Sequence, residues 1–202
     1  RAFSSGQDLA DPSLGADFDV GRVLAEEYEP LLRAIVAAPV PVIAAVNGTA
    51  AGAGANLALA ADVVIAAESA SFIQAFTRIG LIPDAGGTWV LPRTVGLARA
   101  MGAALFADRI PARQAADWGM IWEAVPDAEF EAHWRARAAA LAAGPGAAHA
   151  RVKTAMRAAF ANGLEAQLAL EARLQAECGA TTDFREGVAA FLEKRPARFT
   201  GT

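Results

Sequence analysis

Residues 41–66 read PVIAAVNGTAAGAGANLALAADVVIA, two apolar runs joined by a stretch of very small residues. The first apolar run, over residues 39–48, ends at an Asn-Gly pair, which is typical of a buried strand closed by a turn. Residues 50–62 then predict a tight glycine loop leading into a short buried helix. The second run, over 62–69, predicts another buried strand. The stretch therefore predicts a strand, a helix and a strand in succession.

Regular elements are predicted on both sides of this stretch. Residues 1–9, RAFSSGQDL, have the pattern of a strand end that enters a loop, and the loop continues over 11–21. Apolar residues recur at helical spacing over 22–37, which predicts an amphipathic helix. The remaining predictions for the first part of the chain are a strand and loop over 69–83, a helix over 84–108, a helix over 111–119 with Pro111 as its first residue, and a strand over 119–126.

The pattern changes near residue 127 and is helical from there to the end. Strands that alternate with helices, followed by helices alone, favour an α/β core over residues 1–126 and a helical region over 127–202. The last helix has a start signal in Asp183 as N-cap with Glu186 three residues later. Because the chain opens within a strand pattern, we expect N-terminal strands that precede Arg1 to be missing from it.

The composition excludes several classes of protein. Hydrophobic residues make up 54% and charged residues 20%, which is unlike a disordered tail, and no apolar run is long enough for a membrane helix. The single cysteine, Cys178, cannot form an internal disulfide, so we expect a reducing compartment, the cytoplasm. A net charge of −4 without a basic stripe argues against nucleic acid as a partner. His133 and His149 lack metal-ligand spacing, so no metal site is expected.

Two glycine turns can present main-chain N–H groups to a ligand. They are FSSGQDL at 3–9 and NGTAAGAGANLALA at 47–60, and the second precedes a helix whose first N–H groups have no intrahelical partner. Such groups bind anions or a developing oxyanion. An ordinary turn, or tight helix packing without a ligand, explains the same residues. A dinucleotide fingerprint is disfavoured, because Leu57 stands where the third glycine of G-x-G-x-x-G is needed.

Asp84 is the candidate acid or base of the chain. It lies in GLIPDAGGTW at 80–89, between Pro83 and a glycine pair, with apolar neighbours. Burial among apolar groups raises the pKa of a carboxyl and suits it to proton transfer near neutral pH. The alternative is a structural role as N-cap of the following helix.

A small group of cations lies near the C-terminus. FLEKRPARF at 191–199 combines Lys194, Arg195 and Arg198 with two phenylalanines, a set that can hold phosphates and flank a purine. The alternative is a solvated helix end at which cations are favoured by the helix dipole.

Taken in order, four segments resemble the crotonase (enoyl-CoA hydratase/isomerase) superfamily: residues 1–9, 41–66, 70–96 and 186–199. The resemblance implies an α/β spiral of ββα turns, of which the first turn would precede Arg1. It also implies a helical C-terminal region that forms trimers, or hexamers as dimers of trimers. The partner implied is an acyl-CoA thioester, with no cofactor beyond the coenzyme A of the substrate.

The resemblance also implies roles for particular residues. The two main-chain N–H groups that hold the thioester oxygen fall on Gln7 and Ala53. The segment Gln7, Asp8, Leu9 and Ala10 would run along the coenzyme A tail, while Phe191 and Lys194 would reach a coenzyme A held by a neighbouring subunit.

The acid/base positions separate the subclasses of this family. Hydratases carry two glutamates that activate water, and their places here hold Asn56 and Phe76, neither of which can accept a proton. Hydration is therefore disfavoured. Asp84 occupies the position of the functional aspartate of several isomerases and of 4-chlorobenzoyl-CoA dehalogenases. A dehalogenase would also place a histidine near the first loop, and none stands there.

Within the family, residues 51–66, 80–93, 116–125 and 185–201 resemble the ring-1,2-epoxyphenylacetyl-CoA isomerases of aerobic phenylacetate degradation. These convert the aryl epoxide thioester to an oxepin and can shift a 3-enoyl double bond to the 2-enoyl position. Phe76 and Trp89 would wall a pocket for the ring. The alternatives are a Δ3,Δ2-enoyl-CoA isomerase or hydratase-like enzyme of fatty-acid metabolism, a non-catalytic acyl-CoA-binding homologue, and a nicotinamide-binding protein.

Overall fold

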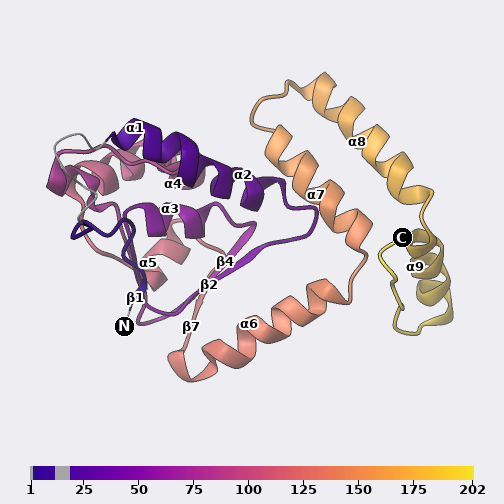
Figure 1. Cartoon of the computed structure of the whole chain (residues 1–202). Helices are drawn as coiled ribbons and strands as arrows, with labels where there is room; N and C mark the ends of the chain where they lie inside the picture. Colours follow the sequence, from indigo (N-terminus) through magenta and orange to yellow (C-terminus); the bar gives the residue numbers. More distant parts are fainter. Residues whose placement is uncertain (1, 12–18) are drawn as a thin grey trace. The chain divides into compact units, whose positions relative to one another are not determined.

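The first part of the chain carries two small sheets, each built mainly from parallel strands. A computed structural model describes residues 2–11 and 19–202. It divides the chain into two compact units, Arg1–Ala38 with Val42–Trp134 and Pro39–Pro41 with Arg135–Thr202. The first unit contains all the described strands (Figure 1). The domain boundary expected at residues 126 and 127 stays a prediction.

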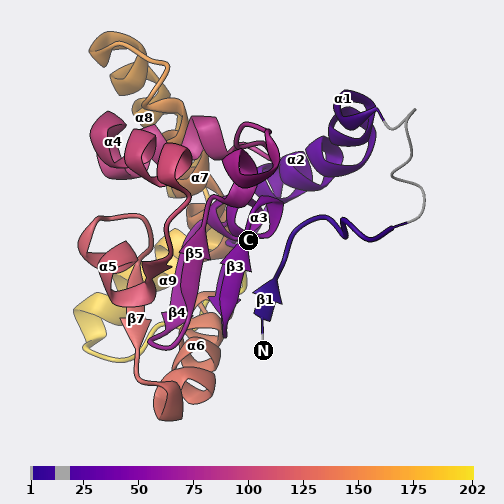
Figure 2. The ribbon, with the colours of Figure 1, turned by 90° about the vertical axis from the view of Figure 1, so that its left-hand side faces the viewer.

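From β1 to β5, consecutive strands of the chain belong alternately to the two sheets, and β6 joins the same sheet as β5. One has the order β1-β3-β5-β6 and the other β2-β4-β7; β6 is antiparallel to β5, and the other pairs are parallel. Figure 2 shows β1, β3 and β5 side by side. The bounds are β1 Ala2–Ser4, β2 Ile43–Val46, β3 Thr49–Ala51, β4 Val63–Ala67, β5 Ser71–Ile73, β6 Ile110–Pro111 and β7 Glu123–Val125. The chain thus passes from one sheet to the other at Asn47-Gly48, where the sequence predicts a turn. The elements β2, β3 and α3 (Ala53–Leu59) form one ββα turn.

The helix predicted over 22–37 is present but not uniform. It comprises α1 (Val20–Val23), a π-helical segment η1 (Leu24–Tyr28) and α2 (Glu29–Ala37). Single π-helical turns are rare and often occur at functional sites. The side chain of Asp19 caps the start by accepting a hydrogen bond from the amide of Arg22.

The middle of the first unit follows the predicted order with two differences. After the 3-10 helix η2 (Ala75–Ile79), helix α4 (Gly87–Phe106) is interrupted at Gly96, where φ is 77° and ψ is 161°. The two-residue strand β6 was not predicted, and it makes Pro111 the N-cap of α5 (Ala112–Asp117) rather than its first residue. Helix α6 runs from Asp127 to Ala142.

Small residues let the elements of the first unit pack closely. The core contains the fully buried Val46, Ile65 and Phe72, which come from strands of both sheets. A Cβ atom on Gly54 would lie 2.3 Å from the side-chain oxygen of Ser4, so α3 can approach β1 only because this position is glycine. This contact brings the loop after β1 to the start of α3.

The second unit is helical, with α7 (Gly146–Ala158), α8 (Leu164–Gly179) and α9 (Thr182–Glu193). Helices α7 and α8 are joined by an ion pair between Arg151 and Glu177 and by a hydrogen bond from Gln167 to the carbonyl of Ala155. Several large apolar side chains on these helices, and Phe160 in the turn between α7 and α8, are exposed; those on the helices are Val152, Met156, Leu164, Leu168, Phe184, Val188, Phe191 and Leu192.

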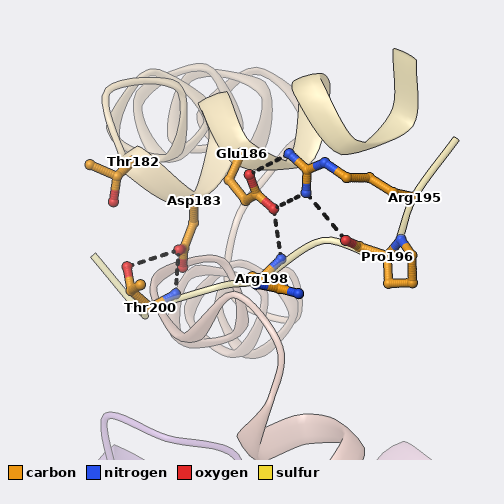
Figure 3. A pocket seen from close by; sticks show the side chains of 7 residues that line it. All are labelled: Thr182, Asp183, Glu186, Arg195, Pro196, Arg198 and Thr200. Atoms are coloured by element: carbon orange, nitrogen blue, oxygen red, sulfur yellow. Dashed lines mark hydrogen bonds and ion pairs between the residues drawn. The ribbon is translucent and has the colours of Figure 1, made fainter. Parts of the chain in front are cut away.

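The predicted N-cap of α9 is wrong. Thr181 is the N-cap, and its hydroxyl accepts a hydrogen bond from the amide of Phe184. Asp183 lies in the first turn, where its buried carboxylate accepts hydrogen bonds from the amides of Thr200 and Gly201 at 2.7 and 2.9 Å (Figure 3). The hydroxyl of Thr181 can cap a helix as the carboxylate of an aspartate can, so the Asp183 side chain is left to bind the C-terminal segment.

Candidate active site

One pocket of the first unit, about 510 Å³ in volume, gathers residues from five segments of the chain. Its walls come from the loop after β1, from α1 and η1, from the start of α3, from η2 and from the turn before α4. The residues that line it are Ser5, Gly6, Gln7, Leu9, Val20, Val23, Leu24, Tyr28, Gly52, Ala53, Ala75, Phe76, Arg78, Ile79, Leu81 and Asp84. The lining is mostly apolar, with a few polar groups, as is usual for small-molecule sites.

The two predicted N–H donors, Gln7 and Ala53, line this same pocket. Gly6 precedes Gln7 and has a φ of 81°, and a Cβ atom there would lie 3.1 Å from the carbonyl oxygen of Ala51 and 3.3 Å from the amide nitrogen of Ala53. The loop is therefore pressed against the start of α3. Ala53 is the first residue of that helix, where an N–H has no intrahelical acceptor.

Asp84 also lines the pocket. Its Oδ1 atom is buried and has no hydrogen-bond partner within the described residues 2–11 and 19–202. Burial raises the pKa of this carboxyl above its usual value, because the charged form loses solvation. The N-cap alternative is wrong: α4 begins at Gly87 with Gly86 as N-cap and has no side-chain cap, and the amide of Gly87 donates to the main-chain carbonyl of Asp84 at 2.8 Å.

A hydrogen bond from the side chain of Asn56 holds the main chain of the turn that carries Asp84. The buried amide of Asn56 donates to the main-chain carbonyl of Asp84 at 2.8 Å and accepts from Nε2 of Gln74 at 2.8 Å. A Cβ atom on Gly87 would lie 2.3 Å from Nδ2 of Asn56, so this approach requires glycine. Asn56 thus stands where the resemblance places a hydratase carboxylate, but it supports the Asp84 turn and is not among the lining residues.

Tyr28 is a polar group of the pocket that the sequence placed only on a helical stripe. Its hydroxyl donates to Oε1 of Gln7 at 2.8 Å. Burial raises the pKa of Tyr28, and the charges of Asp84 and Glu27 raise it further, so the phenol keeps its proton at neutral pH. Tyr28 is the one tyrosine in the sequence, which is the only sequence signal that could have singled it out.

The other predicted substrate contacts divide into two groups. Leu9 and Phe76 line the pocket, whereas Asp8 and Ala10 are not among the lining residues and form a turn in which Oδ1 of Asp8 accepts from the amide of Ala10. Trp89, expected as a second aromatic wall, is not a lining residue either; the guanidinium of Arg93 lies over its ring at 4.5 Å.

The C-terminal cations belong to the second unit. Lys194 ends α9 in a left-handed conformation, and Phe191 is 83% exposed. Arg195 pairs with Glu186 and Glu193, each at 2.6 Å, so the charge of this one cation of the cluster is balanced within the unit. The resulting polar pocket, lined by Asp183, Glu186, Arg195, Arg198 and others, is seen in Figure 3.

Two kinds of feature are absent from the described part of the chain, a metal site and a membrane-spanning helix. No group of three or more His, Cys, Asp or Glu side chains could hold a metal ion there. No described helix is both long and apolar enough to cross a membrane.

Residues 1–202 match the sequence profile described as Enoyl-CoA hydratase/isomerase. The chain belongs to this family. A Rhodobacter capsulatus protein named "Probable enoyl-CoA hydratase" is 70% identical over 201 residues, which are 100% of the chain and 78% of that protein. The 1,2-epoxyphenylacetyl-CoA isomerase of Escherichia coli K12 is 48% identical over 204 residues, again 100% of the chain and 78% of the relative.

The fold agrees with this family. A crystal structure of a family protein from Mycobacterium abscessus, 38% identical, superposes with a TM-score of 0.91 over 100% of this chain and 78% of that one. The crotonase-type α/β fold with a helical C-terminal region, predicted from the sequence, is therefore confirmed. The chain is a member of an enzyme family whose members bind acyl-CoA substrates.

Proposed function

We propose that this family member is an isomerase of acyl-CoA thioesters and not a hydratase. The observation that carries the proposal is that Asp84 is the one carboxylate among the described residues that line the pocket. The hydratase positions hold Asn56, whose amide is committed to hydrogen bonds, and Phe76, an apolar wall residue. A single carboxylate suits a reaction in which one group removes a proton and returns it.

The reaction starts from a thioester whose carbonyl oxygen accepts hydrogen bonds from the N–H groups of Gln7 and Ala53. Asp84 takes a proton from the carbon next to the carbonyl, and the electron pair moves onto the oxygen as an enolate. The two N–H groups stabilise this charge, a contribution of about 10²–10³ in rate per donor in related chemistry. Asp84 then returns the proton two carbons further along, which moves the double bond into conjugation with the thioester.

The preferred substrate is 2-(1,2-epoxy-1,2-dihydrophenyl)acetyl-CoA, which would give oxepin-CoA in aerobic phenylacetate catabolism. Phe76 and Leu24 give the pocket apolar walls that suit a ring, and the Escherichia coli relative is named for this epoxide substrate. Ring expansion breaks the ring C–C bond that the epoxide oxygen bridges and keeps both C–O bonds, and the polarised carbonyl and Asp84 would assist it by moving a proton from the carbon next to the thioester. Conversion of 3-enoyl to 2-enoyl-CoA would be the second activity, with no cofactor beyond the coenzyme A of the substrate.

The coenzyme A tail would run along residues 7–10, and Phe191 and Lys194 would reach a tail bound to a neighbouring subunit. Such an arrangement needs a trimer or hexamer. The exposed apolar side chains of α7 to α9, among them Met156, Phe160 and Leu192, support an assembly that covers them.

The second candidate is enoyl-CoA hydration in fatty-acid metabolism, favoured by the name of the Rhodobacter capsulatus relative. The discriminating experiment supplies the intact protein with the aryl epoxide thioester, a 3-enoyl-CoA and crotonyl-CoA. The proposal expects turnover of the first two and little hydration of the third. Fast hydration of crotonyl-CoA would reject the isomerase assignment, and binding of every thioester without turnover would indicate a non-catalytic homologue.

A further inference from the structure

One side-chain hydrogen bond connects the helical wall of the pocket to the loop that carries a proposed N–H donor. The hydroxyl of Tyr28 donates to Oε1 of Gln7 at 2.8 Å, between residues 21 positions apart. Tyr28 is the last residue of the π-helical segment η1, and both residues line the pocket that contains Asp84. The bond therefore lies within the site and not on a remote surface.

The rest of this wall is apolar. Val20, Val23 and Leu24 line the pocket from α1 and η1, and Tyr28 adds the one hydroxyl among the described lining residues of these two elements. The phenol stays protonated, because burial and then the negative charges of Asp84 and Glu27 raise its pKa. A protonated phenol facing a side-chain carbonyl oxygen can act only as the donor, so the direction of the bond is defined.

Gln7 needs such support because its main chain follows a glycine turn. Gly6 has a φ of 81°, and its amide is held by the side-chain oxygen of Ser4 at 3.3 Å. A donor to a developing oxyanion is effective only if its direction is set before the reaction. Fixing the Gln7 side chain restricts the rotation of the peptide unit that carries its N–H.

Resting on the proposed function, we propose that Tyr28 is a positioning residue of the thioester site, which holds the Gln7 main-chain N–H through the Gln7 side chain. Tyr28 does not touch the reacting atoms in this scheme. Its loss weakens the contact to the oxyanion in the transition state more than it weakens the binding of the substrate. The effect therefore falls on kcat and leaves KM nearly unchanged.

The test is a double-mutant cycle on 3-enoyl-CoA isomerisation. Tyr28→Phe removes the hydroxyl, Gln7→Met removes the acceptor but keeps the main-chain N–H, and Gln7→Leu replaces it should the methionine variant not fold. Each single variant is expected to lower kcat about 2- to 12-fold, the range for loss of one neutral hydrogen bond. The double variant should lose no more than either single variant, because both remove the same bond.

The control is Glu26→Gln, on the same helical segment but outside the pocket, where Glu26 pairs with Arg22. It is expected to keep the kcat of the unaltered protein. Losses from Tyr28→Phe and Gln7→Met that simply add, or a Tyr28→Phe variant with normal kcat, would overturn the inference. A large loss of kcat in Tyr28→Phe with no loss in Gln7→Met would also overturn the inference, because Tyr28 would then act without Gln7.

A second readout does not require turnover. The chain has one tyrosine, so the ultraviolet absorbance of the phenolate reports the titration of Tyr28 alone. Gln7→Met should lower the pKa of Tyr28, because it removes the acceptor that stabilises the protonated phenol; Asp84, Glu27 and the lining Arg78 are unchanged in this comparison. If no thioester is turned over, the proposed function fails, and an unshifted pKa in Gln7→Met separately overturns the role of Tyr28.

Discussion

Asn56 and Asp84 are joined by a hydrogen bond of 2.8 Å from the side-chain amide of the first to the main-chain carbonyl of the second. Asn56 is fully buried, and its own oxygen is held by Gln74. The position that carries a water-activating glutamate in hydratases, by resemblance, thus carries a residue that fixes the turn of the proposed acid/base group. This difference is the structural basis for proposing proton transfer and not hydration.

Replacing Asn56 by alanine should destabilise the protein and reduce isomerase activity. The change leaves the buried amide of Gln74 without its acceptor, which costs about 1–3 kcal/mol, and loosens the Asp84 turn. Denaturant unfolding and kcat measure the two effects. Asn162→Ala removes a partly buried bond to Gln167 in the other unit and is the matched control, expected to leave kcat unchanged. Equal activity losses in both variants would contradict the role of Asn56.

Gly87→Ala should be strongly damaging, because the new methyl group would lie 2.3 Å from Nδ2 of Asn56. The same substitution at Gly102, also in α4, meets no heavy atom within 4 Å. Gly102→Ala is expected to be neutral or to stabilise by up to about 1 kcal/mol through helix propensity. Thermal unfolding should give a clearly lower melting temperature for Gly87→Ala than for Gly102→Ala. Similar melting temperatures would show that Asn56 leaves room for a methyl group at position 87.

Asp84→Asn should make the folded protein more stable at neutral pH. Burial raises the folded-state pKa of Asp84, so the protonated form is favoured by folding and the ionised form is disfavoured. The stability linked to this proton is fully present below the unfolded pKa and is lost as the pH rises through the raised folded value. Melting temperatures of both proteins should therefore converge on acidification, and a gap that widens toward low pH would contradict this sign.

Glu186→Gln should release the C-terminal segment from α9. The carboxylate of Glu186 accepts from Arg195 and from the amide of Arg198 at 2.7 Å, and the Arg195 bond first of all lowers its pKa to about 2. The stability that the ionised Glu186 contributes is fully present above its unfolded-state pKa of 4.5. It is lost as the pH falls from there through the folded-state pKa of about 2. Protection of the amides of residues 195–202 from hydrogen exchange should be lower in the variant than in the unaltered protein at neutral pH. The unaltered protein should lose the same protection as the pH falls from 4.5 to about 2. Unchanged protection would show that Asp183 alone holds the segment.

The sequence predicts those strands and helices that are determined by a pattern of neighbouring residues. The apolar runs around Ile43 and Val63 predict buried strands, and the small residues at 52–55 predict the tight start of α3. Contacts between distant segments were out of reach. Tyr28 meets Gln7 across 21 residues and Gln74 meets Asn56 across 18, and such pairs follow from packing that no local pattern encodes. Within α4, an isolated glycine does not reveal that Gly96 breaks the helix.

The most direct test of the account is the rate of 3-enoyl-CoA isomerisation by Asp84→Asn. The amide keeps the size of the side chain but cannot take the proton, so kcat should fall about 10²- to 10⁴-fold, the range for general acid–base catalysis. Far-ultraviolet circular dichroism and thermal unfolding confirm that the variant is folded. A folded Asp84→Asn protein with kcat within a few-fold of the unaltered enzyme would remove Asp84 from the reaction and contradict the central claim.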